Sequence, residues 1–358
     1  MSLHKLDIYG VRNIQRESIS FAPTFNFIYG QNASGKSALL EAIFILGRAK
    51  SFRSTSIKSV INFQHDHLTV SAQVLQSNGL NNTVGIQLDG KNIEIRINQQ
   101  ASQKRSDLAY TLPLQLIHPK SYELLDAGPQ IRREFLDWGV FHNEQNFLPA
   151  WRRYKKALLQ RNVLLKSKKT SQIDVWDKEL VNYGTIVDSY RFHYLEKFTP
   201  VFVEIAEIFV PVEKFELNLV SGWDNGKSFH QGLIDDFDKD LRYGFTHSGP
   251  HRGDLQLMIN QRLAKDFISR GQLKLLVLTL KLAQVQLLMK ETNKIGCILI
   301  DDFAAELDVI NRSKVLNYLS KTGCQVIITA TDADHFGDLR YIHNYKMFHV
   351  EHGSITPV

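Results

Sequence analysis

The feature that most constrains this chain is an eight-residue pattern near its N-terminus with the spacing G-x-x-x-x-G-K-S. Glycines at these positions let successive backbone N–H groups turn inward around phosphate oxygens. An apolar run at residues 25–29 precedes the pattern and a helix-like segment at residues 38–46 follows it. A strand before and a helix after are what a phosphate-binding loop requires, because the helix N-terminus adds partial positive charge. The predicted phosphate-binding residues are Gly30, Gln31, Asn32, Ala33, Ser34, Gly35, Lys36 and Ser37.

Two acidic residues at the end of a second apolar run supply the other half of a nucleotide site. Residues 297–300 are apolar, and Asp301 and Asp302 follow them directly. A buried strand delivers its terminal carboxylates to the carboxyl edge of the sheet, where phosphates bind in such folds. We therefore expect Asp301 to hold magnesium together with Ser37. Asp302 is predicted to orient or deprotonate the attacking water, and Lys36 to contact the β- and γ-phosphates.

A short turn before a long amphipathic segment is a third candidate element. Ser269, Arg270, Gly271 and Gln272 precede a predicted helix at residues 272–292 and lie about 30 residues before Asp301. Ser269 suits an ordinary helix N-cap, and a helix N-terminus also attracts anions. In this order and spacing, Ser269, Gly271 and Gln272 resemble the signature motif of the ABC ATPase superfamily. That resemblance implies ATP as the nucleotide, capped by the signature of a second copy, so that ATP binding drives formation of a homodimer.

The positive charge of the chain is concentrated in one segment. The net charge of the whole chain is +6, and residues 130–170 alone contain ten basic and three acidic residues, a local charge of +7. Helical spacing in residues 149–166 predicts one apolar stripe and one basic stripe on opposite sides. The basic stripe is a predicted DNA-binding surface, and a solvated helix face remains the alternative. Its residues are Arg152, Arg153, Lys155 and Lys156.

The order of apolar segments predicts an α/β fold. Strand, helix and strand succeed one another at residues 295–301, 311–320 and 325–329, which implies parallel pairing. Alternating residues at 68–97, with turn dipeptides at 78–79 and 89–90, predict an antiparallel subsheet. A second long helical stretch at residues 174–208 is expected to be interrupted by Pro200. We therefore expect an ATPase head of the ABC type, with a mixed, largely parallel sheet and an antiparallel subsheet, and a helical arm or lid inserted into it. The expected domains are residues 1–125 and 211–358 for the head and residues 126–210 for the insertion.

Composition narrows the class of protein. The longest apolar runs fall well short of the ~20 residues of a membrane span, and the N-terminus lacks the features of a signal peptide. Cys297 and Cys324 lie in strand-like apolar contexts and are expected to be buried thiols. These observations favour a cytoplasmic protein without a membrane partner.

Landmarks spread along nearly the whole chain resemble the RecF family of bacterial recombination mediators. They lie at residues 6–13, 30–37, 51–54, 128–137, 160–166, 248–255 and 269–272. Only 264 residues separate Ser37 from Asp301, which is too short for the long coiled coils of chromosome-maintenance relatives. Two departures stand out: transporter-type ATPases have a histidine where this chain has Thr331, and Ala305 stands where the family usually has a serine.

The RecF resemblance implies a role in recombinational DNA repair. Such proteins bind ATP and Mg²⁺, dimerise on DNA and hydrolyse ATP slowly. They help to load recombinase at single-strand gaps with the partners RecR and RecO, and they support replication restart and the damage response. The sequence leaves one alternative open, a nucleotide-gated scaffold of the SMC-like class whose helical insertion binds protein rather than DNA.

Overall fold

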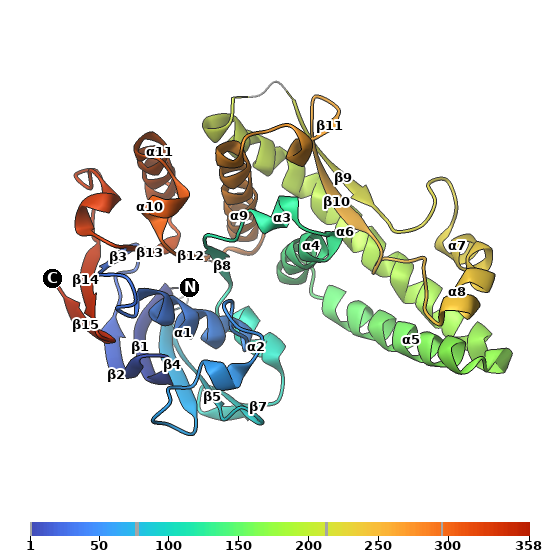
Figure 1. Ribbon diagram of the computed structural model, residues 1–358, viewed down its shortest axis with the longest axis horizontal. Helices are drawn as coiled ribbons and strands as arrows, with labels where there is room; N and C mark the ends of the chain where they lie inside the picture. The colour runs from blue at the N-terminus through green and yellow to red at the C-terminus, as the bar shows by residue number, and fades with distance from the viewer. Residues whose placement is uncertain (1, 76–78, 212–213, 295) are drawn as a thin grey trace. The chain divides into compact units, whose positions relative to one another are not determined.

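The computed structural model describes residues 2–75, 79–211, 214–294 and 296–358. They form two compact units, one made of Met1–Ser121 with Leu278–Val358 and the other of Tyr122–Val277 (Figure 1). The sequence places the start of the second head segment at residue 211, whereas residues 211–277 lie in the same compact unit as the helical segment. The reason is pairing within that unit: strand β9 (Phe215–Val220) pairs with β10 (Asp254–Ile259), and Arg132 forms an ion pair with Asp254.

The first unit contains an antiparallel sheet with the strand order β2-β1-β4-β5-β6-β7. Alternate residues of β4 are buried, as the sequence pattern predicts for a sheet with one solvated face. The turn between β1 and β2 is formed by Arg12 and Asn13, and Arg12 has a positive φ of 55°. Of the two predicted hairpin turns, the one at 89–90 joins β5 to β6, and Asn78 of the other lies outside the described residues. The strands are β1 (Ser2–Val11), β2 (Ile14–Ser20), β4 (Leu68–Leu75), β5 (Asn81–Leu88), β6 (Ile93–Ile97) and β7 (Gln100–Ser102).

A second sheet of the first unit has the order β15-β14-β3-β13-β12-β8 and is parallel except at its β15 edge. Strands β12 and β13 are buried at every residue, as parallel strands covered on both faces are. The predicted parallel pairing is therefore confirmed. The strands are β3 (Phe25–Tyr29), β8 (Leu114–Ile117), β12 (Cys297–Ile300), β13 (Gln325–Ala330), β14 (Lys346–Glu351) and β15 (Ser354–Pro357).

Helix α1 (Lys36–Arg48) joins the two sheets into one core. It contacts β1 and β4 of the antiparallel sheet and β13 and β8 of the parallel sheet, and most of its residues are buried. Cys297 and Cys324 are buried free thiols, as predicted. The other helices of this unit are η1 (Ile57–Ser59), α2 (Arg105–Thr111), α10 (Phe303–Glu306), α11 (Val309–Ser320) and η4 (Ala333–Phe336).

The second unit combines long helices with a three-stranded sheet, β11-β10-β9. Helices α5 (Phe147–Ser167) and α6 (Ile173–Phe209) pack along each other (Figure 1). The predicted interruption at Pro200 is wrong, because α6 runs through it. Phe198, Val201, Phe202 and Ile205 are buried around that point, and their burial outweighs the one backbone bond that proline removes. The remaining elements are α3 (Glu123–Asp126), α4 (Pro129–Asn143), η2 (Thr170–Gln172), α7 (Phe229–Asp235), α8 (Phe237–Tyr243), β11 (Arg262–Leu263) and η3 (Ala264–Asp266).

Helix α9 (Arg270–Thr292) belongs to both residue ranges, and among the described helices it is the one that meets a length and composition criterion for a membrane span. By length and composition alone it could cross a bilayer, with a window of mean hydropathy 1.3. In the structure 72% of that window is buried inside the protein. A mostly buried core helix meets the same criterion, so this is weak evidence for a membrane span.

Candidate functional site

The phosphate loop follows β3 and leads directly into α1. Gly30 and Gly35 have φ values of 159° and 126°, and Gly35 is the residue before the first turn of the helix. A Cβ atom added at Gly30 would lie 2.2 Å from the carbonyl oxygen of Val350, so no side chain fits there. The local sequence thus produces the tight turn that brings backbone N–H groups to one point at a helix N-terminus.

Contacts from two neighbouring turns hold the loop in place. The Asn13 side-chain amide donates a hydrogen bond of 2.9 Å to the Ser34 carbonyl, and the Gly353 N–H donates one of 2.7 Å to the same oxygen. The Ser34 hydroxyl is buried and has no hydrogen-bond partner among the described residues. A buried hydroxyl of this kind can be satisfied by a ligand oxygen, which is one observation that suits a bound phosphate.

The side-chain amine of Lys36 folds back onto the phosphate loop. Its Nζ donates to the carbonyl oxygens of Gly30 at 2.6 Å and Gln31 at 2.9 Å. Burial lowers the pKa of Lys36, and the charges of Asp302 and Asp301 oppose that shift. A desolvated ammonium is favoured by an added anion, because the anion restores the charge compensation that water no longer supplies.

Ser37 and Asp301 are brought together by the fold, as the sequence predicts for a shared magnesium site. The Ser37 hydroxyl donates a hydrogen bond of 3.0 Å to Asp301 Oδ1, and Thr329 Oγ1 donates to the same oxygen at 2.9 Å. Asp301 follows β12 and Thr329 lies on the adjacent strand β13. Burial raises the pKa of Asp301, while the two hydroxyl donors act in the opposite direction.

Asp302 lies beside this pair in a left-handed backbone conformation. Its φ is 54°, and its N–H donates a hydrogen bond of 2.9 Å to Thr329 Oγ1. A non-glycine residue with positive φ is uncommon and is maintained only where its surroundings hold it. The side chain is half-buried and faces the cleft described next.

These residues line a cleft of about 460 Å³ within the first unit. The cleft contains three cationic side chains, Arg12, Lys36 and Arg53, and the two carboxylates Asp301 and Asp302. Its size lies in the range of small-molecule sites. The lining residues are Arg12, Asn13, Asn32, Ala33, Gly35, Lys36, Ser37, Ala38, Arg53, Phe63, Asp301, Asp302 and Thr331.

The donor set fits a magnesium ion that is held jointly by protein and nucleotide. Within the described residues there is no group of three or more His, Cys, Asp or Glu side chains arranged to hold a metal. Mg²⁺ commonly takes one or two protein oxygens and completes its shell with substrate phosphates and water. Ser37 and Asp301, joined at the phosphate loop, offer that kind of partial site.

Arg12, Asn13 and Arg53 line the cleft, a position that their place among the sequence landmarks does not indicate. Arg12 is fixed by Glu41, a fully buried carboxylate of α1, through hydrogen bonds of 2.8 and 2.9 Å. Ser51 also donates to Glu41, and Arg53 lies 3.9 Å from it. The signal available in the sequence was an acid, Glu41, at a helix position that is otherwise apolar.

Thr331, which stands where transporter-type ATPases have a histidine, lines the cleft. Its hydroxyl shares a hydrogen bond of 2.9 Å with Nδ1 of His335. His335 is half-buried, and its backbone carbonyl accepts a hydrogen bond from the Arg312 side chain. Among the described residues His335 is not part of the cleft lining, and it contacts Thr331, which is.

The signature-like turn forms a capping box. The Ser269 hydroxyl accepts from the Gln272 N–H at 3.2 Å, and the Gln272 side chain accepts from the Ser269 N–H at 3.1 Å. This reciprocal pair satisfies two backbone donors at the start of α9. Ser269 and Gly271 are exposed, and Ser269, Gly271 and Gln272 are not among the described residues that line the cleft.

The predicted DNA-binding residues Arg152, Arg153, Lys155 and Lys156 are all exposed on α5. Arg153 lies over the ring of Tyr183. On the opposite side of α5, Tyr154, Leu158 and Leu165 are buried, as the helical pattern predicts.

Three other basic residues of the +7 segment are internal, which reduces the charge available to a partner. Arg161 is fully buried between Asp177 and Asp240, at 2.5 and 2.6 Å. Arg132 pairs with Asp254, and Arg133 donates to the carbonyl of Gly253. The interpretation of the whole segment as one basic footprint is therefore corrected: its exposed charge lies on α5 and in the residues just after it.

His251 and Arg252, whose role the sequence leaves open, lie in the second unit. His251 Nε2 donates to the Thr246 carbonyl at 3.0 Å, and Nδ1 accepts from the Tyr154 hydroxyl at 2.6 Å. Burial lowers the pKa of His251 to about 4, so the ring is neutral near pH 7. These contacts give His251 a structural role in holding α5 to the loop before β10.

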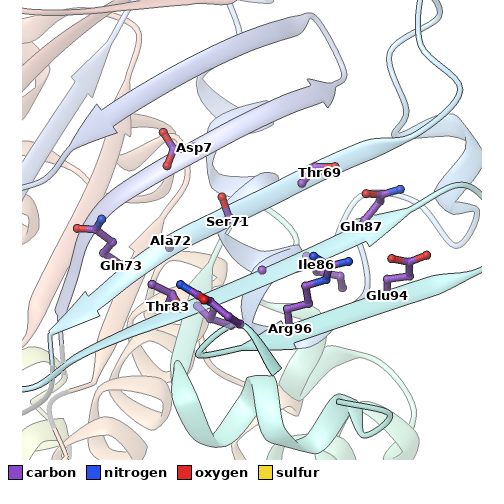
Figure 2. Close-up of a pocket in the computed structure, with 13 residues that line it drawn as sticks. Asp7, Thr69, Ser71, Ala72, Gln73, Thr83, Ile86, Gln87, Glu94 and Arg96 are labelled. Carbon is purple, nitrogen blue, oxygen red and sulfur yellow. The ribbon is translucent and has the colours of Figure 1, made fainter. Parts of the chain in front are cut away.

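A second hollow, of about 380 Å³, lies on the outer face of the antiparallel sheet (Figure 2). Its side chains project from β1, β4, β5 and β6, and they include Asp7, Ser71, Gln87, Glu94 and Arg96. They are the outward-facing partners of the buried core positions of the same strands. The described lining of this hollow contains no helix N-terminus of the kind that follows the phosphate loop.

Comparison with known proteins places this architecture among ATP-binding proteins of DNA maintenance. The family model described as "RecF/RecN/SMC N terminal domain" matches residues 2–356. The DNA replication and repair protein RecF of Vibrio vulnificus (strain CMCP6) is 40% identical over 358 residues, which cover 99% of each chain. The RecF of Shewanella piezotolerans (strain WP3 / JCM 13877) is also 40% identical, over 100% of each chain.

Solved structures with the same fold belong to a RecF protein and to a Smc head domain. A structure of the recombination mediator protein RecF with ATP, in the RecFOR pathway, has a TM-score of 0.89 and 25% identity, and the match covers 100% of this chain and 97% of that one. A Smc head domain from Pyrococcus furiosus, at 18% identity and a TM-score of 0.60, shares the fold over 100% of this chain and 96% of that one. The expected α/β head with inserted helices is thereby confirmed.

Proposed function

This chain belongs to the RecF family of DNA replication and repair proteins, within the ATP-binding RecF/RecN/SMC class, and we propose that it is a DNA-dependent ATPase that closes as a dimer. Two observations support nucleotide binding. A solved relative with the same fold carries ATP, and the cleft of this chain contains the phosphate loop beside two carboxylates. The single observation that supports the site best is the hydrogen bond between Ser37 and Asp301.

Each group of residues in the cleft has a separate proposed role in ATP hydrolysis. Backbone N–H groups of residues 30–37 would hold the phosphates, and Lys36 would balance the charge of the β- and γ-phosphates. Magnesium, held by Ser37 and Asp301, would neutralise phosphate charge. Asp302 would accept a proton from the attacking water, whose oxygen bonds to the γ-phosphorus as the bond to ADP breaks. Because an aspartate is one methylene shorter than the glutamate usual in the wider class, we expect slow turnover.

The signature-like turn supports a site completed by a second copy of the chain. Ser269 and Gly271 are exposed and the turn is held rigid by its capping box. An exposed helix N-terminus can receive the γ-phosphate of ATP bound to another subunit. ATP would then link two heads, and hydrolysis would release them.

DNA is the proposed macromolecular ligand, and α5 is the proposed contact. Its exposed basic residues would meet phosphates, so binding would depend on salt and not on base sequence. The solved relative is a recombination mediator of the RecFOR pathway. By that relationship we propose action at single-strand gaps in the cytoplasm, with RecO and RecR as partners, in loading recombinase.

A scaffold that closes on nucleotide without binding DNA is the second candidate. The observation that favours it is the internal pairing of Arg132, Arg133 and Arg161, which removes charge from the basic segment. ATP turnover with and without DNA separates the two candidates, because only the first requires DNA to alter the rate.

Sedimentation with ATP, with ADP and without nucleotide tests the clamp directly. Asp302→Asn, which should slow turnover, is expected to sediment as a dimer with ATP and as a monomer with ADP. Lys36→Met should stay monomeric in all three conditions and should not hydrolyse ATP. Persistence of both dimerisation and turnover in Lys36→Met would show that the site is assigned to the wrong residues.

A further inference from the structure

Phe63 is the most exposed of the large apolar side chains in the described part of the chain, at 90%. It lies in the cleft that contains the phosphate loop. An exposed aromatic ring loses the free energy that burial would supply, about 25 cal/mol for each Å² of apolar surface. Single exposed apolar residues are common on protein surfaces, so exposure alone carries no conclusion. Phe63 differs from such residues in two ways, its position in the nucleotide cleft and its fixed backbone.

The turn that presents Phe63 is firmly attached to the β1–β2 hairpin. Asn62 is buried, its N–H donates to the Gly10 carbonyl at 2.9 Å, and its side-chain amide donates to the Arg12 carbonyl at 2.6 Å. The Asn62 carboxamide oxygen accepts from the Gln64 N–H at 2.9 Å, and the Asn62 carbonyl accepts from the His65 N–H at 2.9 Å.

The residues after Phe63 are fixed in the same way. The ring of His65 packs against Tyr9 with centroids 4.5 Å apart, and its Nδ1 lies 3.1 Å from the Tyr9 hydroxyl. Asn62 and His65 are thus anchored on both sides of an exposed phenyl ring. The backbone that carries this ring is therefore fixed before any ligand arrives, which lowers the ordering cost of binding.

The chemistry of the cleft is divided between an anion site and this aromatic ring. Lys36, the loop N–H groups and Ser37 suit phosphates, whereas the apolar ring of Phe63 suits the flat face of a base. We propose that Phe63 is the stacking platform for the nucleobase of the nucleotide whose phosphates occupy the loop. This inference rests on the proposed nucleotide site and adds the residue that recognises the base.

Stacking predicts which ligands depend on Phe63. Every base has a π-face, so an aromatic platform tolerates different bases. Phe63→Ala should therefore weaken ADP and GDP binding alike, by about tenfold. It should leave the affinity for inorganic pyrophosphate unchanged, because that ligand has no base. Phe63→Trp should keep ADP affinity, and its indole fluorescence should be quenched when ADP binds.

The experiment is calorimetric titration of the full chain, with magnesium, using ADP, GDP and pyrophosphate as probes. Phe192→Ala is the matched control, since Phe192 is 54% exposed on α6 and does not line the cleft. Equal ADP affinity in wild type and Phe63→Ala would overturn the inference. So would loss of ATP-dependent dimerisation with unchanged ADP affinity, because Phe63 would then contact a second copy of the chain.

The same titrations keep this inference separate from the proposed function. Absence of ADP binding to the wild-type chain would refute the nucleotide site itself, together with the platform. If Lys36→Met lost the binding of ADP and pyrophosphate, the nucleotide site would be supported. If Phe63→Ala then changed the affinity for neither ligand, only the role of Phe63 as a stacking platform would be rejected. A pyrophosphate affinity that falls as much as the ADP affinity in Phe63→Ala would assign Phe63 to loop geometry and reject stacking.

Discussion

The hydroxyl of Ser37 donates a 3.0 Å hydrogen bond to the carboxylate of Asp301, although 264 residues separate the two in sequence. Ser37 begins α1 after the phosphate loop, and Asp301 ends the buried strand β12. Thr329 of the neighbouring strand donates to the same carboxylate oxygen. The parallel sheet thus assembles the two proposed magnesium ligands, because its strands bring their carboxyl ends to one edge.

Asp301→Asn should stabilise the fold and remove magnesium-dependent nucleotide binding. Burial raises the pKa of Asp301, so the folded state binds a proton more tightly than the unfolded chain does. The carboxylate therefore costs stability as the pH rises above its unfolded pKa and through its folded pKa. An asparagine oxygen can still accept from Ser37 and Thr329, and we expect a gain of about 0.5–2 kcal/mol at pH 7.

Thermal unfolding without nucleotide measures the gain, and nucleotide titration with and without Mg²⁺ measures the loss. Asp238→Asn, on the exposed face of α8, is the control and should change neither. A destabilised Asp301→Asn protein would mean that the carboxylate charge itself holds the site together.

Neutralising the four exposed basic residues of α5 should weaken DNA binding without unfolding the protein. The variant replaces Arg152, Arg153, Lys155 and Lys156 by glutamine. Each lost phosphate contact should reduce the slope of log affinity against log salt by about 0.9, so a full loss lowers the slope by up to about 3.6. Affinity for duplex and gapped DNA, measured over a range of salt concentrations, provides the slope.

Two further variants control for charge and for folding. A set of the same charge change in the first unit, Lys58, Lys91, Lys104 and Arg105 to glutamine, should leave the salt slope near the wild-type value. Arg161→Gln should destabilise the protein by about 3–5 kcal/mol, because it leaves the buried Asp240 without its cation. An equal loss of DNA binding in both surface sets would move the DNA contact away from α5.

The parts of the site that could be predicted are those that depend on local order in the chain. The phosphate loop, the acids after β12 and the alternation in β4 each follow from residues that are neighbours in sequence. The pairing of Arg161 with Asp240 joins residues 79 positions apart, and that of Arg132 with Asp254 joins residues 122 apart. A charge count along the chain cannot distinguish such internal cations from exposed ones. The place of Phe63 in the cleft likewise depends on residues distant in sequence, because its neighbour Asn62 forms hydrogen bonds with Gly10 and Arg12.

His251 should make the second unit sensitive to acid. Burial lowers its pKa to about 4, below the ordinary value of about 6.5. The unfolded chain therefore binds more protons than the folded chain between these values. The stability that His251 contributes is present above pH 6.5 and is lost as the pH falls towards 4.

Denaturant unfolding at a series of pH values between 4 and 8 measures this effect. His251→Gln can keep one donor and one acceptor, towards Thr246 and Tyr154, and it cannot titrate. We expect it to cost about 1 kcal/mol at pH 7 and to flatten the loss of stability below pH 6.5. Burial also lowers the pKa of His118 to about 4. His118 therefore contributes its own loss of stability at acid pH, which remains in the His251→Gln variant. An unaltered slope in His251→Gln would show that His251 does not control the acid response.

Pro200→Ala should stabilise helix α6, which continues through position 200 despite the proline. Proline has no N–H, so the carbonyl of Glu196 receives no bond from position 200, and alanine would restore that bond. A proline inside a helix costs about 3 kcal/mol relative to alanine, and its restriction of the unfolded chain returns about 0.4–1 kcal/mol. The expected net gain in the free energy of unfolding is about 2–2.6 kcal/mol. Denaturant unfolding measures it, with Glu207→Ala, an exposed residue of the same helix, as a control that should stay within about 0.5 kcal/mol of wild type. No gain in Pro200→Ala would mean that the packing of Phe198, Val201 and Phe202 requires the local bend that proline produces.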